Sequence, residues 1–147
     1  MAKITAMDVA KYAISKCQED NHPITNLQLQ KMLYYIQYFF LVKTEEPLFD
    51  DDFEAWKFGP VISNVYYEYR IYGALPIDLD GNKIEFNNIN IEDKKLLDYV
   101  IEKTRVMYPW RLVEQSHAKG KAWDSVFMDG FGAGDIIEKM DIKNNGF

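Results

Sequence analysis

The segment 25–42 contains so few polar residues that it constrains the fold more than any other part of the chain. Thr25 and Gln28 stand three positions apart, the spacing at which two side chains cap the first turn of a helix. As a helix, the segment is apolar on two faces, made of Leu29, Met32, Leu33, Ile36, Phe39 and Phe40 and of Leu27, Tyr34, Tyr38 and Leu41. A helix that is apolar on two sides belongs in the centre of a core. We therefore predict a helical protein built around this segment.

Local signals predict further helices along the chain. Thr5 and Asp8 repeat the capping spacing just before an apolar stripe. Gly59-Pro60 predicts the start of another helix, because proline fits the first helical turn, where its missing amide costs nothing. Asn90 can cap a further helix. With similar proline signals, these features predict helices over 6–19, 25–42, 59–73, 91–107, 110–117 and 136–140.

Extended structure is expected in two short places. Residues 53–58 are aromatic and read as extended, and 75–86 alternates apolar and polar residues around Asp80-Gly81, which predicts a hairpin. No internal repeat or long linker divides the 147 residues. The prediction is a mainly α fold, a compact single-domain bundle of about five to six helices with a small β-hairpin, spanning 1–147.

The charge and cysteine content indicate which kind of partner the protein binds and in which compartment it lies. Asp and Glu outnumber Lys and Arg by 23 to 17, a formal net charge of -6, which argues against a nucleic-acid partner because phosphate binding depends on basic side chains. Cys17 is the single cysteine, so no internal disulfide forms, as is usual in a reducing cytoplasm. The N-terminal residues contain no signal core, and no apolar run is long enough to span a membrane. We expect a cytoplasmic protein.

The chain offers no convincing catalytic or metal-binding set. His22 and His117 are the only histidines, and neither has the spacing of metal ligands with Cys17 or a carboxylate. No nucleophile motif surrounds a serine, and the glycine-rich run 130–134 lacks the residues of a phosphate-binding loop. We therefore expect no cofactor, no metal and no enzymatic activity. The alternative that stays open is an enzyme with His117 and nearby carboxylates as its acid–base set.

A cluster of carboxylates follows the central helix. It consists of Glu45, Glu46, Asp50, Asp51, Asp52 and Glu54. A solvated loop is the default interpretation of such a cluster, with Mg²⁺ binding or contact with a basic partner as alternatives.

Several short motifs resemble those of the Panacea domain, the SocA-like antitoxin family. The resemblance rests on the hexapeptide LQKMLY at 29–34, on PLF at 47–49 and on AWKFGPV at 55–61. It extends to Tyr66, Tyr69, Leu112, His117 and Trp123 and so covers most of the chain. The family often has proline before the tryptophan, and here Ala122 takes that place. The signature positions, with either a structural or a binding role, are Gln30, Lys31, Leu33, Tyr34, Pro47, Val61, His117 and Trp123.

The resemblance implies a mostly helical protein from a bacterium or prophage that binds and neutralises a protein toxin. The alternative is a phage-associated adaptor or regulator that presents a host protein to other machinery, such as a protease. The resemblance does not name the toxin. It also leaves open whether the toxin is blocked or handed over and whether this copy is functional or a prophage remnant. No heptad pattern specifies self-association, so a homo-oligomer also stays open.

Aromatic residues outside the predicted core indicate where a partner could bind. Tyr67 falls on the polar side of the predicted helix 59–73, and exposed aromatic residues are common anchors at interfaces. Basic residues lie close to it in the sequence. We predict a partner-binding site made of Trp56, Lys57, Gly59, Pro60, Tyr67 and Arg70, with the alternative that Trp56, Gly59 and Pro60 simply fix the entry to the helix.

Overall fold

A computed structural model describes residues 3–80, 84–107, 114 and 117–147 of the chain. The described residues form six α-helices and one three-stranded sheet, which confirms the mainly α prediction. In chain order the elements are α1 (Ala6–Glu19), α2 (Asn26–Thr44), β1 (Phe53–Trp56), β2 (Gly59–Val61), α3 (Ser63–Tyr69), α4 (Ile91–Thr104), α6 (Ala122–Phe127), β3 (Ile136–Ile137) and α7 (Lys139–Asn145), with 3₁₀ turns at Arg70–Tyr72 and Met128–Gly130.

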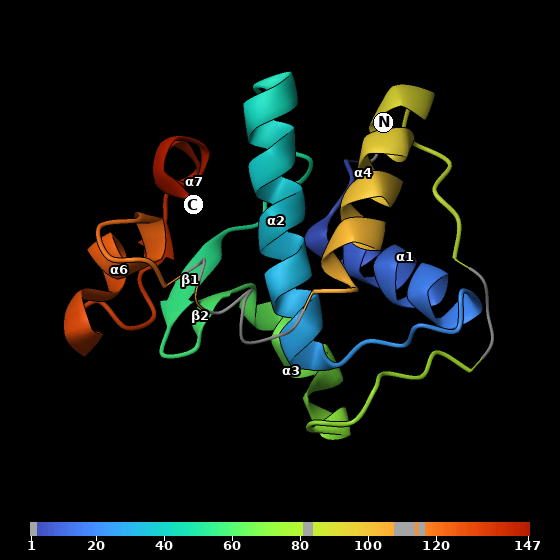
Figure 1. Cartoon of the computed structure of the whole chain (residues 1–147), viewed down its shortest axis with the longest axis horizontal. Coiled ribbons are helices and arrows are strands. Elements are labelled where there is room, and N and C mark those ends of the chain that lie inside the picture. The colour runs from blue at the N-terminus through green and yellow to red at the C-terminus, as the bar shows by residue number, and fades with distance from the viewer. Residues whose placement is uncertain (1–2, 81–83, 108–113, 115–116) are drawn as a thin grey trace.

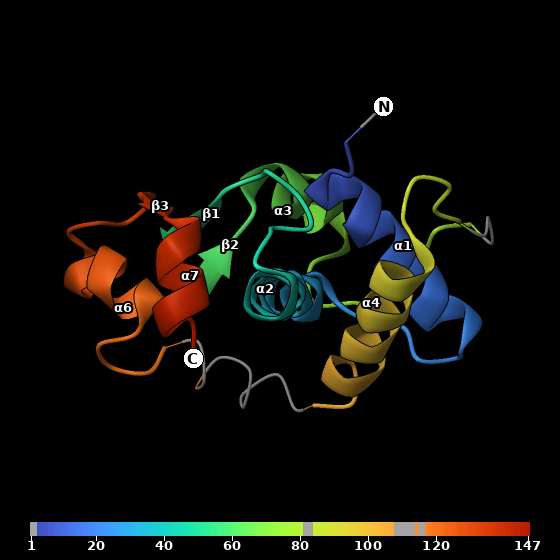
Figure 2. The ribbon, with the colours of Figure 1, turned by 90° about the horizontal axis from the view of Figure 1, so that it is seen from above.

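Helix α2 is the central element of the molecule. It lies between α1 and α4 on one side and the sheet with α6 and α7 on the other, as Figures 1 and 2 show from two directions. Leu29, Leu33 and Ile36 have no exposed surface. The prediction from the two apolar faces is therefore confirmed, because both sides of α2 are covered by other elements.

The caps predicted from sequence form at three helix starts. Thr5 and Asp8 make a reciprocal capping box at α1, and Thr25 and Gln28 make another at α2. The side chain of Asn90 accepts a hydrogen bond from the backbone N–H of Asp93 at α4, at 2.8 Å. Each such cap stabilises the protein by about 1 kcal/mol, so these helix starts are defined by local interactions.

The start of the third helix differs from the prediction. Gly59 and Pro60 belong to strand β2, which pairs antiparallel with β1 in the register Trp56↔Gly59 and Glu54↔Val61. Helix α3 begins only at Ser63. A proline at the outer strand of a sheet loses no ladder hydrogen bond, so Gly-Pro here closes a hairpin turn. The small β-hairpin of the fold is thus β1–β2.

The hairpin predicted at 75–86 is wrong for the described residues, which contain no strand there. This segment instead runs along α1. The backbone N–H of Leu79 donates to the Gln18 side chain at 3.0 Å, and that of Ile84 donates to the Ser15 hydroxyl at 3.0 Å. The apolar alternation reflects packing of Ile77 and its neighbours on the core, not strand pairing.

The C-terminal part also departs from the prediction. The expected helix 110–117 lies largely outside the described residues. Ile136 and Ile137, predicted as helical, form strand β3 on the free edge of β1, and α7 follows from Lys139. Helix α6 was not predicted. The strand order is β2-β1-β3, so the chain returns after some eighty residues to complete the sheet.

Candidate functional site

Lys31 lies in the interior of the protein, on the side of α2 that faces the β1–β2 turn. Its side chain is 1% exposed, and its Nζ donates a hydrogen bond to the carbonyl oxygen of Phe58 in that turn. No carboxylate in the described part of the chain forms an ion pair with it. Burial lowers the pKa of Lys31 to about 7, because the charged amine is poorly solvated there. A lysine is thus used as a buried hydrogen-bond donor.

Gly59 is required where the turn passes Lys31. Its φ angle of +115° suits glycine, and a Cβ atom at this position would lie 2.0 Å from Lys31 Nζ and 3.0 Å from His117 Nε2. The backbone of the turn therefore touches both side chains directly. Pro60, the next residue, is also buried.

His117 and Trp123 hold the same turn from the opposite side. The two rings stack at 3.9 Å with an interplanar angle of 7°, and Trp123 Nε1 donates to the carbonyl oxygen of Trp56 at 2.7 Å. Burial, followed by the positive charge of Lys31, lowers the pKa of His117, while the Phe58 carbonyl and the Asp124 carboxylate act in the opposite direction. The turn is clamped between α2 and α6.

Gln30 fixes the segment that follows the turn. Its side-chain oxygen accepts from the backbone N–H of Ile62 at 3.1 Å, and its amide donates to Asn26 at 3.2 Å. Asn26 in turn donates to the carbonyl oxygen of Tyr66 at 3.1 Å. These buried amides orient α3 relative to α2. A role for Asn26 was not predicted from the sequence. Its position directly after the cap residue Thr25 was the available signal.

The other signature residues lie in the core or in the loop after α2. Leu33 and Tyr34 are in the core, and Val61 is buried at the end of β2. Pro47 is partly buried in the loop after α2. That loop is held by Gln37, which accepts from Leu48 N–H at 3.0 Å and donates to the Phe49 carbonyl at 2.8 Å. A role for Gln37 was also not predicted from the sequence. Its signal in the sequence is a glutamine within the otherwise apolar and aromatic stretch 32–42.

We use the name aromatic face for the residues that β1 and its turn share with α3 and the 3₁₀ turn after it: Trp56, Lys57, Phe58, Tyr66, Tyr67 and Arg70. The Trp56 ring lies 5.0 Å from the Tyr66 ring and 5.9 Å from the Tyr67 ring, measured between centroids. Phe58 is 66% and Tyr67 53% exposed. The Arg70 guanidinium lies 5.4 Å from the centre of the Tyr67 ring. Four of the six predicted partner-binding residues thus belong to this face, whereas Gly59 and Pro60 lie beneath it.

The carboxylates after α2 hold other parts of the chain. Asp50 pairs with Lys3 at 3.0 Å, and Asp52 pairs with Lys139 at 3.0 Å. Asp51 accepts from the backbone N–H of Ala6 at 2.9 Å. The loop therefore connects the start of α1 to α7. Within the described residues, no three His, Cys, Asp or Glu side chains are grouped as metal ligands.

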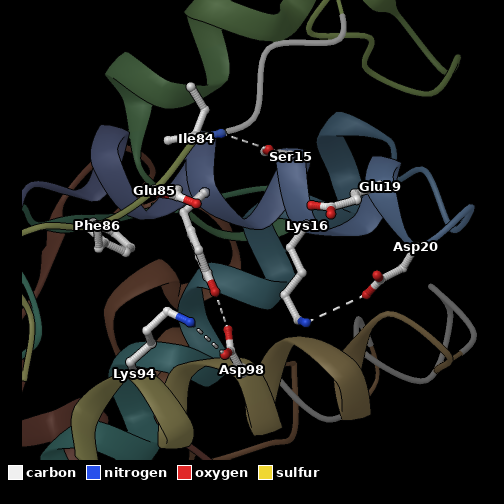
Figure 3. Close-up of a pocket in the computed structure, with 10 residues that line it drawn as sticks. Ser15, Lys16, Glu19, Asp20, Ile84, Glu85, Phe86, Lys94 and Asp98 are labelled. Carbon is white, nitrogen blue, oxygen red and sulfur yellow. Dashed lines mark hydrogen bonds and ion pairs between the residues drawn. The ribbon is translucent and has the colours of Figure 1, made fainter. Parts of the chain in front are cut away.

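A polar cleft of about 400 Å³ lies between α1, α4 and the segment 84–86 (Figure 3). Lys16 points toward Asp20, with a distance of 3.5 Å between Nζ and the carboxylate, and Lys94 is equally far from Asp98. Asp98 also accepts a hydrogen bond from the Tyr12 hydroxyl. None of the partner-binding or signature residues predicted from the sequence lines this cleft. Both lysines thus pair within their own helix, and Lys16 also pairs with Glu102 of α4 at 3.3 Å.

The residues around the turn coincide with a family match. Residues 29–124 match the family described as "Antitoxin SocA-like, Panacea domain", a span that contains Lys31, Gly59, His117 and Trp123. The chain belongs to the SocA-like antitoxin family. It is 36% identical over 132 residues to Antitoxin SocA of Caulobacter vibrioides (strain NA1000 / CB15N), an alignment covering 84% of this chain and 70% of the relative. No solved structure matches the chain.

The described helices of this SocA-like chain include none that is long and apolar enough to cross a membrane. Several residues of the family signature lie at the β1–β2 turn. The signature residues Gln30, Lys31, His117 and Trp123 all contact the β1–β2 hairpin or the segment that leads from it into α3.

Proposed function

We propose that this protein is an antitoxin that binds a protein toxin through the aromatic face and neutralises it. The observation that carries the proposal is the convergence of four signature residues beneath a turn whose outer side is exposed and aromatic. Buried Lys31, Gly59 and Trp123 would keep the turn rigid, and a rigid aromatic surface loses little conformational entropy on binding. The name of the 36% identical relative supports the antitoxin assignment.

We propose that the buried residues of the site shape the turn and that the exposed residues contact the toxin. Gly59 and Pro60 are buried and act on the partner through the shape of the turn. Tyr67 and Arg70 are exposed and would touch the toxin, together with Lys57 and the edge of Trp56. Tyrosine, tryptophan and arginine are the residues that most often dominate the energy of protein interfaces. The partner is a protein in the cytoplasm, and the mechanism is stoichiometric binding without catalysis, cofactor or metal.

The test is co-expression with the protein encoded beside this chain, scored by growth of the host. The wild-type chain should restore growth and co-purify with a neighbour that is toxic alone. The double variant Tyr67→Ala/Arg70→Ala should lose rescue while its melting temperature stays within a few degrees, because exposed substitutions cost little stability.

Helix α4 supplies a matched control. Tyr99 is 54% exposed, and Lys103 Nζ lies 5.5 Å from its ring centre, so this pair copies the Tyr67–Arg70 arrangement on another surface. Tyr99→Ala/Lys103→Ala should keep full rescue. Equal loss in both double variants would contradict the assigned surface. Disappearance of the toxin without a stable complex would instead favour the adaptor function.

A further inference from the structure

We infer that the aromatic face takes an acidic segment of the partner protein, one that also carries apolar side chains. This inference rests on the proposed antitoxin function and specifies the chemistry of the toxin at its contact. It follows from the charges on the face, from their surroundings and from the charge of the remaining surface.

The two cations of the face have no carboxylate partner within the described residues. Lys57 Nζ lies 5.9 Å from the centre of the Phe58 ring, and Arg70 lies over Tyr67. By contrast, Lys3, Lys139 and Arg105 each pair with an aspartate at 3.0 Å or less. Lys57 and Arg70 are therefore available to an anion from outside.

Neither of the acidic residues nearest in sequence, Glu54 and Glu68, forms an ion pair with Lys57 or Arg70 in the described part of the chain. The Glu54 carboxylate accepts a hydrogen bond from Trp56 Nε1 at 3.0 Å. Glu68 lines a separate cleft of about 400 Å³ together with Lys11, Tyr69 and Ile71. The Glu54 carboxylate therefore borders the face at Trp56, while Lys57 and Arg70 keep no carboxylate at ion-pair distance among the described residues.

The charge of the whole chain directs an acidic partner to this surface. The formal net charge is -6, so an acidic segment is repelled by most of the molecule. Its carboxylates can meet Lys57 and Arg70, while apolar side chains pack on Phe58 and Tyr67, which are 66% and 53% exposed. A nucleic acid would need a larger basic surface than two cations beside this net charge.

Charge reversal in the complex with the toxin tests the inference. Lys57→Glu/Arg70→Glu should weaken the measured affinity by about 100-fold or more, because like charges would then face each other. The wild-type affinity should fall when NaCl rises from about 50 to about 300 mM, as screening requires. The matched control is Lys95→Glu/Lys103→Glu on α4, which changes the net charge equally and should alter the affinity by no more than about threefold.

The outcomes separate this inference from the proposed function. A wild-type complex whose affinity is unchanged or increased by Lys57→Glu/Arg70→Glu overturns the acidic partner and leaves the antitoxin function intact. Absence of any wild-type complex or rescue contradicts the antitoxin function itself.

A second measurement needs no toxin. In an NMR titration, a peptide of glutamate and phenylalanine should shift the amides of 57–58 and 67–70, and the same peptide with glutamine for glutamate should not. Equal shifts from both peptides, or preferential binding of a single-stranded oligonucleotide there, would overturn the inference.

Discussion

Lys31 is buried and has a single carbonyl partner among the described residues. Its protonation therefore makes the free energy of unfolding depend on pH. Its pKa of about 7 in the folded protein lies below the ordinary value of 10.5. Between these values the unfolded chain carries a proton that the folded protein lacks, so the free energy of unfolding increases with pH. Below about pH 7 both states are protonated, and the cost of the buried charge is fully present.

The first prediction concerns this slope. From pH 7 to pH 9, the wild-type free energy of unfolding should gain about 2 kcal/mol, and the gain should vanish in Lys31→Met. Urea denaturation at several pH values measures it. Lys103→Met, which removes an exposed lysine, should keep the gain. A Lys31→Met variant with the wild-type slope would show that Lys31 is not buried.

The second prediction concerns the contact between Lys31 and Gly59. Gly59→Ala should lower the free energy of unfolding by about 3 kcal/mol, because the new Cβ collides with Lys31 Nζ and the backbone is strained as well. Gly120→Ala is the matched control. Its φ angle is +80°, but no atom lies within 4 Å of the added Cβ, so only the strain of about 1 kcal/mol remains. Equal losses would mean that the turn does not approach Lys31.

Individual contacts at the turn could not be predicted from the sequence. Lys31, Phe58 and His117 are far apart along the chain, and only tertiary packing brings them together. The exposure of Tyr67 could be predicted, because it depends on the periodicity of one short helix. The burial of Gly59 and Pro60 depends on the partner strand, which local residues do not reveal.

Among the elements, α6 matters most for the site because it carries Trp123 to the back of the β1–β2 turn. The same part of the chain supplies β3. The N–H of Ala55 donates to the Asp135 carbonyl at 2.8 Å, and the N–H of Gly134 donates to the Ala55 carbonyl at 2.8 Å. The C-terminal segment is thus attached to β1 through backbone bonds and one indole.

The third prediction is that loss of the indole donor loosens this attachment. Trp123→Phe keeps an aromatic ring for His117 but removes the bond to the Trp56 carbonyl, a loss of about 1–2 kcal/mol. Hydrogen exchange should accelerate at Ala55 and Gly134 but not within α1. The control is Trp56→Phe, because the Trp56 indole N–H donates to nearby Glu54. Faster exchange throughout the chain would contradict a local effect.

The same contrast between local and distant interactions explains which elements sequence reasoning found. Helices α1, α2 and α4 were predicted with their caps, because capping residues lie next to the turn they stabilise. Strand β2 was mistaken for a helix start, since Gly-Pro suits both. Strand β3 was missed because its partner β1 lies some eighty residues earlier, and two isoleucines alone do not distinguish a strand from a helix.

At the scale of the whole molecule, α2 separates two regions of the fold. On one side, α1 and α4 are joined by ion pairs such as Lys16 with Glu102 at 3.3 Å. On the other side lie the sheet, α6 and α7 (Figure 2), and α6 packs against β1. We therefore propose that the first region stabilises the fold and that the aromatic face beside the second binds the partner.

The most direct test is hydrogen–deuterium exchange of the chain with and without its toxin. We expect new protection at 56–58 and 64–70, the two segments that carry the aromatic face, and unchanged exchange along α4. Protection confined to α4 or to the cleft between α1 and α4, with none at the aromatic face, would contradict it.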